Sequence, residues 1–360
     1  MSAEPARARV WVLGVDSGGS GLRVALGRQD ADSGAPPVPA GTVTCPEPVR
    51  TGSAGIDAAH MAELLLPAVR TLLADAHGGQ DGEEDDGHGG GARIAAACVG
   101  AAGMATLGDG LRAELPGILA AGCGVRRLAL AADAVTAYAG ALGERPGAVV
   151  AAGTGMIAMG TDLMTWRRAD GWGHLLGDCG SGAWVGRAGL EAALRAHDGR
   201  SGGSPVLRAA AEEMFGAPLS GLPAQLYPRT DRPAVLASFA PRVARCAGQD
   251  PVAAQIIRAA AREIAASAVA VCPEGSGSDG DAGQGTPHAD VRIAFTGGLF
   301  NLGEPLTGPL RAELAKRRPG VVVTEAAGSP LDGALLIAGR LAAGGLSLPR
   351  DPALLSVSET

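Results

Sequence analysis

The fold class is indicated most clearly by residues 9–29, RVWVLGVDSGGSGLRVALGRQ. Two apolar runs flank a turn of glycine and serine, which is the pattern of two strands joined in a β-hairpin. The first run ends on Asp16, so a carboxylate stands where the first strand stops. Further along, GAVVAAGTGMIAMG, residues 147–160, repeats the order of strand, glycine-rich turn and strand. The sequence therefore predicts two α/β halves, each opening with a glycine-cornered hairpin.

Apolar runs and helical spacing alternate through the rest of the chain. The expected strands are residues 41–45, 93–100, 126–133, 292–301 and 320–326, and the expected helical regions are residues 56–76, 180–272 and 331–343. Two stretches rich in glycine and acid, residues 77–91 and 273–290, cannot bury apolar surface. They are expected to be flexible loops.

Length and composition limit the class of protein. The chain has 360 residues, which favours two domains over one core. Its formal net charge is -7 and no run is dense in Lys or Arg, so no nucleic-acid partner and no anionic membrane partner is expected. The start of the chain has no room for a signal peptide, no apolar run could span a bilayer, and the six cysteines are scattered. These features predict a soluble cytoplasmic protein with buried thiols.

The turn of the first hairpin is suited to an anion. Glycines without Cβ let backbone N–H groups turn toward a phosphate, and Asp16 could hold a hydrated Mg²⁺. An ordinary hairpin turn with a capping aspartate is the alternative. The candidate phosphate-binding residues of this hairpin are Asp16, Ser17, Gly18, Gly19, Ser20 and Arg23.

The second turn repeats the plan with Gly153, Thr154 and Gly155. It lacks the Gly-Lys-Ser/Thr ending of a P-loop, so a purely structural hairpin is its alternative interpretation. Two such hairpins, each opening one half of the chain, favour two phosphate-binding loops that face each other across an interdomain cleft.

Two further strand ends carry candidate residues. Asp133 follows the apolar run RRLALAAD and starts a helical stretch, so it is either an N-cap or a general base that deprotonates an attacking hydroxyl. The carboxyl end of a strand is where an α/β sheet opens to ligand, which favours the base. In FTGGLFN, Gly297 and Gly298 would let an adenine or ribose approach the backbone, or they simply form a tight turn.

A further candidate is the loop at residues 169–186, ADGWGHLLGDCGSGAWVG. It holds two of the four tryptophans of the chain among six glycines. Asp178 in this loop is placed just before an expected helix start, so a cap on the helix that enters at Ser181 is one interpretation of it.

The order of these motifs resembles the actin-like ATPase superfamily. It resembles most closely the N-acetylglucosamine kinases grouped with the BadF/BadG/BcrA/BcrD ATPases, over about residues 10–340. The resemblance implies two ribonuclease H-like domains with ATP and Mg²⁺ in the cleft between them. The domains would be residues 1–143 with a C-terminal helix at about 331–350, and residues 144–330.

The resemblance also implies roles for the candidate residues. Asp133 would be the base acting on the 6-hydroxyl of an amino sugar, and the two hairpins, with Asp16 at the metal, would hold the phosphates. Gly297 and Gly298 would contact adenosine. The residues implied to contact the sugar are Gly171, Trp172, Gly173, His174 and Asp178.

Three positions depart from the family pattern. Met156 and Ile157 stand where the kinases have Ser-Asn, and Cys179 replaces a glutamate. The expected substrate is therefore N-acetylglucosamine, glucosamine or a related hexose, and family analogy implies a homodimer. The alternatives are an ATPase activator that carries an iron–sulfur cluster to a dehydratase, and a nucleotide-dependent regulatory protein.

Overall fold

The computed structural model describes residues 9–19, 21–30, 34–52, 55–78, 93–274 and 291–359. The predicted loops at 77–91 and 273–290 lie outside the described residues from residue 79 and from residue 275 on, as does Ser20. The chain forms two compact α/β units. Unit 1 consists of Met1–Arg145, Leu163–Trp166 and Ala326–Thr360, and unit 2 of Pro146–Asp162 and Arg167–Glu325.

Unit 1 is built on a sheet in the order β13-β7-β6-β1-β2-β3. Its strands are β1 (Arg9–Gly18), β2 (Gly21–Asp30), β3 (Val38–Cys45), β6 (Ile94–Ala101), β7 (Arg127–Ala132) and β13 (Leu355–Glu359). The hairpin strands β1 and β2 are antiparallel, whereas β1, β6 and β7 run parallel. A short pair, β4 (Thr51–Gly52) and β5 (Gly55–Ile56), stands apart from this sheet.

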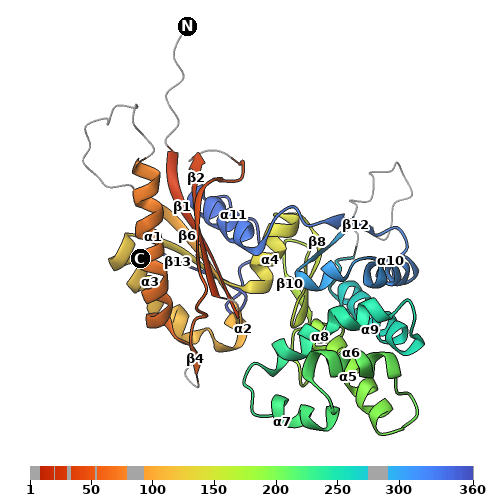
Figure 1. Ribbon diagram of the computed structural model, residues 1–360. Helices are drawn as coiled ribbons and strands as arrows, with labels where there is room; N and C mark the ends of the chain where they lie inside the picture. Colours follow the sequence, from red (N-terminus) through yellow and green to blue (C-terminus); the bar gives the residue numbers. More distant parts are fainter. Residues whose placement is uncertain are drawn as a thin grey trace, which may run out of the picture. The chain divides into compact units, whose positions relative to one another are not determined.

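Helices cover both faces of the unit 1 sheet, as Figure 1 shows. They are α1 (Ala58–Gly78), α2 (Met104–Leu107), α3 (Asp109–Cys123), α4 (Asp133–Leu142) and α11 (Pro330–Ala342). Helices α1 and α3 pack on one another, and α4 and α11 pack on one another and on β1 and β6. Because both faces are covered, the central strands are buried along nearly their whole length, which explains their continuous apolar sequence.

Unit 2 repeats the central plan of unit 1. Its sheet has the order β10-β9-β8-β11-β12, in which β8 and β9 form an antiparallel hairpin and β8, β11 and β12 are parallel. The strands are β8 (Gly147–Ala152), β9 (Met156–Thr161), β10 (Trp166–Asp170), β11 (Arg292–Thr296) and β12 (Val322–Glu325). Each unit therefore joins a hairpin to two parallel strands.

The helices of unit 2 bury a second core. They are α5 (Gly182–His197), α6 (Pro205–Phe215), α7 (Leu222–Leu226), α8 (Arg232–Cys246), α9 (Pro251–Val271) and α10 (Glu304–Arg317), with 3₁₀ turns η1 (Leu219–Gly221) and η2 (Gly298–Leu302). In α9 the buried positions recur at helical spacing and are mostly alanine. Small side chains there let the helix lie close to its neighbours.

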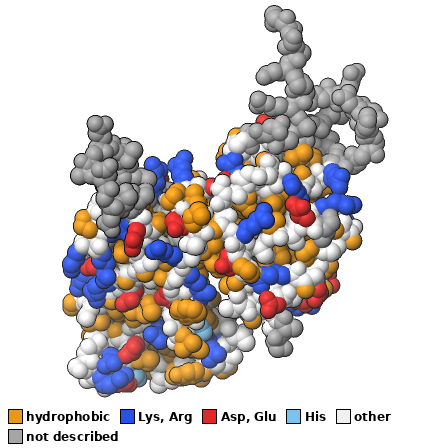
Figure 2. Space-filling view, turned by 180° about the vertical axis from the view of Figure 1, so that it is seen from behind, with side chains coloured by type: hydrophobic (Ala, Val, Ile, Leu, Met, Phe, Trp, Pro, Cys, Tyr) orange, Lys and Arg blue, Asp and Glu red, His pale blue; other side chains and the backbone are white. Residues whose placement is uncertain are grey.

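The predicted α/β class is confirmed, and most elements begin within a few residues of the predicted positions. Strands β10 and β13 and the short pair β4 and β5 were not predicted. The region predicted as helical from 180 to 272 consists of the five helices α5 to α9 and the 3₁₀ turn η1. None of the helices in the described residues combines the length and the apolar character that a bilayer crossing requires. Figure 2 shows acidic and basic side chains interspersed on the face that it presents.

Candidate functional site

Two predicted carboxylates lie at one edge of the unit 1 sheet. Strands β1, β6 and β7 are parallel neighbours, with Asp16 opposite Gly100 and Ala101 opposite Ala132. Asp133 directly follows β7. The carboxyl ends of parallel strands meet at the same edge, so the topology brings Asp16 and Asp133 to that edge with only β6 between them.

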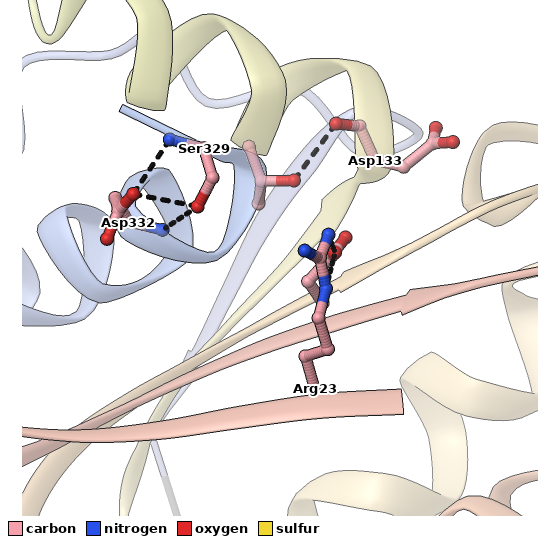
Figure 3. Close-up of polar contacts among 6 residues, drawn as sticks. Arg23, Asp133, Ser329 and Asp332 are labelled. Atoms are coloured by element: carbon pink, nitrogen blue, oxygen red, sulfur yellow. Dashed lines mark hydrogen bonds and ion pairs between the residues drawn. The ribbon is translucent and has the colours of Figure 1, made fainter. Parts of the chain in front are cut away.

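Asp16 is buried and forms an ion pair across the hairpin. Its partner Arg23 is the residue opposite it in the β1–β2 register. The guanidinium donates from Nε to Asp16 Oδ2 at 3.1 Å, and its second nitrogen donates to the same oxygen. Figure 3 shows Arg23 reaching from its strand to make this pair. Both bonds end on Oδ2, which leaves Oδ1 for another partner.

The turn of the first hairpin presents open backbone. At Gly18 and Gly19 nothing lies within 4 Å of the place a Cβ would occupy. Ser17 is buried, and its carbonyl oxygen accepts a hydrogen bond from the Ala102 amide at 3.0 Å. Gly21 was not predicted as a site residue, but a Cβ there would stand 2.2 Å from the Cys45 carbonyl oxygen. The turn is thus held tightly at its base and open at its tip.

Asp133 is the first residue of α4 and is not its N-cap. Ala132 occupies the N-cap position and provides no side-chain cap. Oδ1 of Asp133 instead accepts a hydrogen bond from the Ala134 amide at 2.9 Å. The carbonyl oxygen of Asp133 accepts from the buried hydroxyl of Thr136 at 2.9 Å. The capping interpretation is therefore wrong, and the half-buried carboxylate sits on the first turn of a helix, where the helix dipole stabilises its charge.

Helix α4 is fixed by an unusually close crossing with α11. A Cβ added to Gly140 would stand 2.0 Å from the Ser329 carbonyl oxygen, and one added to Gly333 would stand 2.0 Å from the Thr136 carbonyl oxygen. Ser329 and Asp332 form a capping box that starts α11. Figure 3 shows the Asp133 carboxyl group pointing away from this box. The sequence gives no local sign of this support, because its two glycines lie on helices far apart in the chain.

In unit 2, helix α5 holds the Gly-Thr-Gly turn. The amides of Gly182 and Ala183 donate to the carbonyl oxygens of Gly153 and Thr154, at 2.8 and 3.1 Å. Ser181 caps the same helix by accepting from the Trp184 amide. The first amides of α5 are therefore engaged by the protein, and the hairpin turn is anchored by its carbonyl groups.

Asp178 lies against this turn. It is buried, and its Oδ1 accepts a hydrogen bond from the Gly173 amide at 3.2 Å. A Cβ on Gly155 would stand 2.7 Å from its Oδ2, so only glycine leaves room for the carboxylate. Burial raises the pKa of Asp178, and the nearby Asp170 carboxylate raises it further, whereas the Gly173 amide acts in the opposite direction. Since Ser181 is the N-cap of α5, the interpretation of Asp178 as that cap is wrong.

Asp170 is the residue that sequence reasoning missed. Its two carboxylate oxygens accept from the amides of Asp178 and Cys179, at 2.6 and 2.8 Å. Both aspartates have a positive φ, 60° at Asp170 and 53° at Asp178. Short polar side chains tolerate that conformation better than most others. Asp170 therefore joins the start of the loop to its end at Asp178 and Cys179.

The loop between these aspartates is exposed. Trp172 is 64% exposed, and the Arg168 guanidinium lies 4.4 Å from the centre of its ring. Leu175 and Leu176 are 79% and 86% exposed. The charge of His174 acts on Asp178 and lowers the pKa of that carboxyl. An aromatic ring and a buried carboxylate on this loop, with the Arg168 guanidinium of β10 against the ring, suit the recognition of a polar ring with hydroxyl groups.

The two positions that depart from the family pattern in the second hairpin are apolar in their contacts as well. Met156 is 2% exposed and belongs to the unit 2 core. The side chain of Ile157 faces Gly171, where a Cβ would stand 2.8 Å from its Cδ1. Ile157 therefore packs under the exposed loop and offers no hydrogen bond there.

The predicted adenosine motif lies beside the second hairpin. Gly297 has φ 102°, and a Cβ there would stand 2.3 Å from the Ala152 carbonyl oxygen, at the end of β8. The space around the Cβ position of Gly298 is open. Unit 2 thus gathers Gly153–Gly155, Asp178 and Gly297 at the carboxyl ends of β8 and β11. No group of three or more potential metal-ligating side chains lies among the described residues.

Comparisons with known proteins identify a family and structures with a similar fold. The sequence model of the BadF/BadG/BcrA/BcrD ATPase family matches residues 13–338. A protein of Chromobacterium violaceum, provisionally called an N-acetylglucosamine kinase, has a structure with a TM-score of 0.61 and 27% identity, covering 91% of this chain and 98% of that one. A Porphyromonas gingivalis protein given the same provisional name shares the fold at a TM-score of 0.59 and 17% identity, covering 91% of this chain and 97% of that one.

One curated relative matches over a short segment. An N-acetylmuramic acid/N-acetylglucosamine kinase of Clostridium acetobutylicum is 42% identical over 69 residues, which are 19% of this chain and 22% of that kinase. The chain therefore matches well under half the length of this relative.

Proposed function

Because the chain belongs to the BadF/BadG/BcrA/BcrD ATPase family, we propose that it is an ATP-dependent sugar kinase. Its acceptor would be the 6-hydroxyl of an amino sugar, namely N-acetylglucosamine, glucosamine or a related hexose. The observation that carries this proposal is Asp133, a half-buried carboxylate on the first turn of α4 at the same sheet edge as Asp16. A nucleotide switch has no need of a second carboxylate at that edge.

Asp133 would act as the general base. It would accept the proton of the sugar hydroxyl while the hydroxyl oxygen bonds to the γ-phosphorus of ATP and the bond to the β,γ-bridging oxygen breaks, which releases ADP. The close α4–α11 crossing supports this role, since it holds the first turn of α4 in one place.

The hairpin turns would hold the phosphates. Open backbone at Gly18 and Gly19 suits close approach by an anion. Asp16 would contribute Oδ1 to Mg²⁺, and it fits because Mg²⁺ takes one or two carboxylates and completes its shell with phosphate oxygens and water. Bound there, Mg²⁺ would neutralise charge on the phosphates. Arg23 would keep the Asp16 carboxyl group oriented.

The exposed loop of unit 2 would recognise the sugar. Asp178 would accept hydrogen bonds from sugar hydroxyls, and Trp172 would pack against the ring. Gly297 and Gly298 would lie along the adenosine. Where the kinases present Ser-Asn, Met156 is buried in the core and Ile157 packs under the exposed loop, so neither side chain would offer the sugar a hydrogen bond. A preference for an acceptor other than N-acetylglucosamine would follow from that difference.

The activator alternative needs thiolates at an accessible surface. Burial raises the pKa of Cys98, which lies within β6. Burial also raises the pKa of Cys123 and of Cys179. Cys98 is fully buried and therefore does not present its thiol at a surface, which is an observation against the activator.

The experiment is acceptor-dependent release of ADP from MgATP over a panel of hexoses and amino sugars. The kinase proposal expects stimulation by at least one 6-hydroxyl sugar and none by its 6-deoxy analogue. If no sugar of the panel stimulates the release of ADP, the kinase proposal is wrong. Family analogy further leads us to propose a homodimer in the cytoplasm, which light scattering and cell fractionation would test.

A further inference from the structure

A pocket with charged side chains in its lining is found in unit 1, away from the carboxylates. It has a volume of about 420 Å³. Its walls come from the starts of β1, β6 and β7 and from the end of β13. The lining residues are Val10, Arg93, Ile94, Ala95, Gly124, Arg126, Arg127 and Glu359. We call it the arginine pocket.

The arginine pocket is at the opposite edge of the sheet from Asp133. Arg93 directly precedes β6, and Arg126 directly precedes β7, whereas Asp133 directly follows β7. Strand β7 has 6 residues, and at about 3.3 Å per residue the two ends are roughly 20 Å apart. A ligand in this pocket would therefore not touch the candidate catalytic carboxylate.

The charge of the lining favours an anion. Three arginines and one glutamate line the pocket, which leaves a formal surplus of two positive charges. This surplus stands out in a chain whose net charge is -7. The partner of Arg127 in the pocket is Glu359, with Nε 3.3 Å from Oε1, and that carboxylate is 66% exposed. A partly hydrated pair of this kind compensates little of the local field.

Arg127 is also held in place by main-chain carbonyl groups. Its terminal nitrogen donates to the carbonyl oxygens of Leu341 and Ala342 at the end of α11, at 3.2 and 3.3 Å. One wall of the arginine pocket is thus preorganised by the fold, which reduces the ordering cost of binding. The same bonds make Arg127 a poor choice for mutation, because its loss would disturb α11.

We propose that the arginine pocket binds a small molecule that carries a phosphate monoester. A monoester is close to a dianion at neutral pH, which matches the surplus charge of the lining. Guanidinium groups bind phosphate oxygens in pairs of parallel hydrogen bonds. The volume falls in the range of sites for small organic ligands and exceeds what an isolated phosphate ion needs. The inference is independent of the proposed kinase activity.

The test is titration calorimetry of glucose 6-phosphate into the full chain, at low and at high salt. Arg126→Ala and Arg93→Ala should each weaken binding about tenfold, the value expected for one hydrogen bond to a charged group. Glu359→Gln should strengthen binding, because it removes the acid of the pocket. The matched control is Arg317→Ala, which removes an exposed arginine of α10 that is paired with Glu313. This variant should bind glucose 6-phosphate with the wild-type affinity.

Further arms separate this site from a product-binding active site. In the Asp133→Asn background, Arg126→Ala should weaken the binding of glucose 6-phosphate by the same factor as it does in the otherwise wild-type chain. Arg126→Ala should not change any binding of glucose, which carries no phosphate. The variants should keep the wild-type melting temperature, which shows that a loss of binding is not a loss of fold. Absence of saturable binding, or binding that is equal in wild type, Arg93→Ala and Arg126→Ala, would overturn the proposal whatever the acceptor panel shows.

Discussion

The carboxylates of the two units are positioned in different ways. In unit 1, Asp16 and Asp133 are placed directly by strand ends, so the backbone of the sheet fixes them. In unit 2, Asp178 lies on a loop, and a second carboxylate, Asp170, holds that loop through two backbone amides. A rigid edge suits chemistry, which needs fixed atoms, whereas a clamped loop suits recognition, which can differ between relatives.

The largest effect should come from the rigid edge. Asp133→Asn should lower kcat by about 10³-fold, the usual contribution of a positioned base, while ATP affinity stays near the wild-type value. Steady-state kinetics with the acceptor found in the panel, combined with nucleotide titration, would measure both. Near-normal turnover in this variant would mean that unit 1 does not supply the base.

The next effect should come from the contact between the second hairpin and Asp178. Gly155→Ala would place a Cβ 2.7 Å from Asp178 Oδ2 and displace the carboxylate. We expect kcat/KM for the sugar to fall about 10²-fold, as small misplacements in a site can do. Gly248→Ala, in the loop after α8, is the matched control, since nothing lies within 4 Å of its Cβ position and it is not a candidate site residue. Equal losses in the two variants would show that the loss does not come from Asp178.

A smaller effect should follow from removing the hydrogen bonds that Asp170 accepts from the loop. Asp170→Ala would leave the amides of Asp178 and Cys179 without their acceptor, which should cost about 2 kcal/mol of unfolding free energy. The KM for the sugar should rise about tenfold with a smaller change in kcat. Asp198→Ala, at a surface pair with Arg200, serves as the control. If both variants unfold alike, the loop is not held by Asp170.

The smallest effect is one of pH. Burial raises the pKa of Asp178, so the folded chain keeps this proton to a higher pH than the unfolded chain. Stability contributed by the protonated carboxyl is therefore lost as the pH rises from the ordinary aspartate pKa through the raised one. Asp178→Asn does not titrate, so its Tm relative to wild type should increase with pH across that window. A difference in Tm that is flat with pH would contradict this.

The sequence predicted what is local and missed what depends on distant contacts. The hairpins, the buried strands and the position of Asp133 follow from apolar runs and turn residues close in sequence. Asp170 could not be found in this way, because its partners are amides brought to it by a loop with positive φ. Strand β13 was missed for a similar reason, since it is a short edge strand defined only by its pairing with β7.

The crossing of α4 and α11 has a consequence for the order in which the chain folds. Residues 326–360 belong to unit 1 but are synthesised after unit 2. Until they leave the ribosome, β7 lacks its neighbour β13, and the glycine face of α4 lacks α11. Unit 2 can therefore complete its core during translation, whereas in unit 1 the edge of β7 that pairs with β13 stays unpaired until the end of the chain is made. A nascent chain stalled before residue 326 should bind chaperones through unit 1.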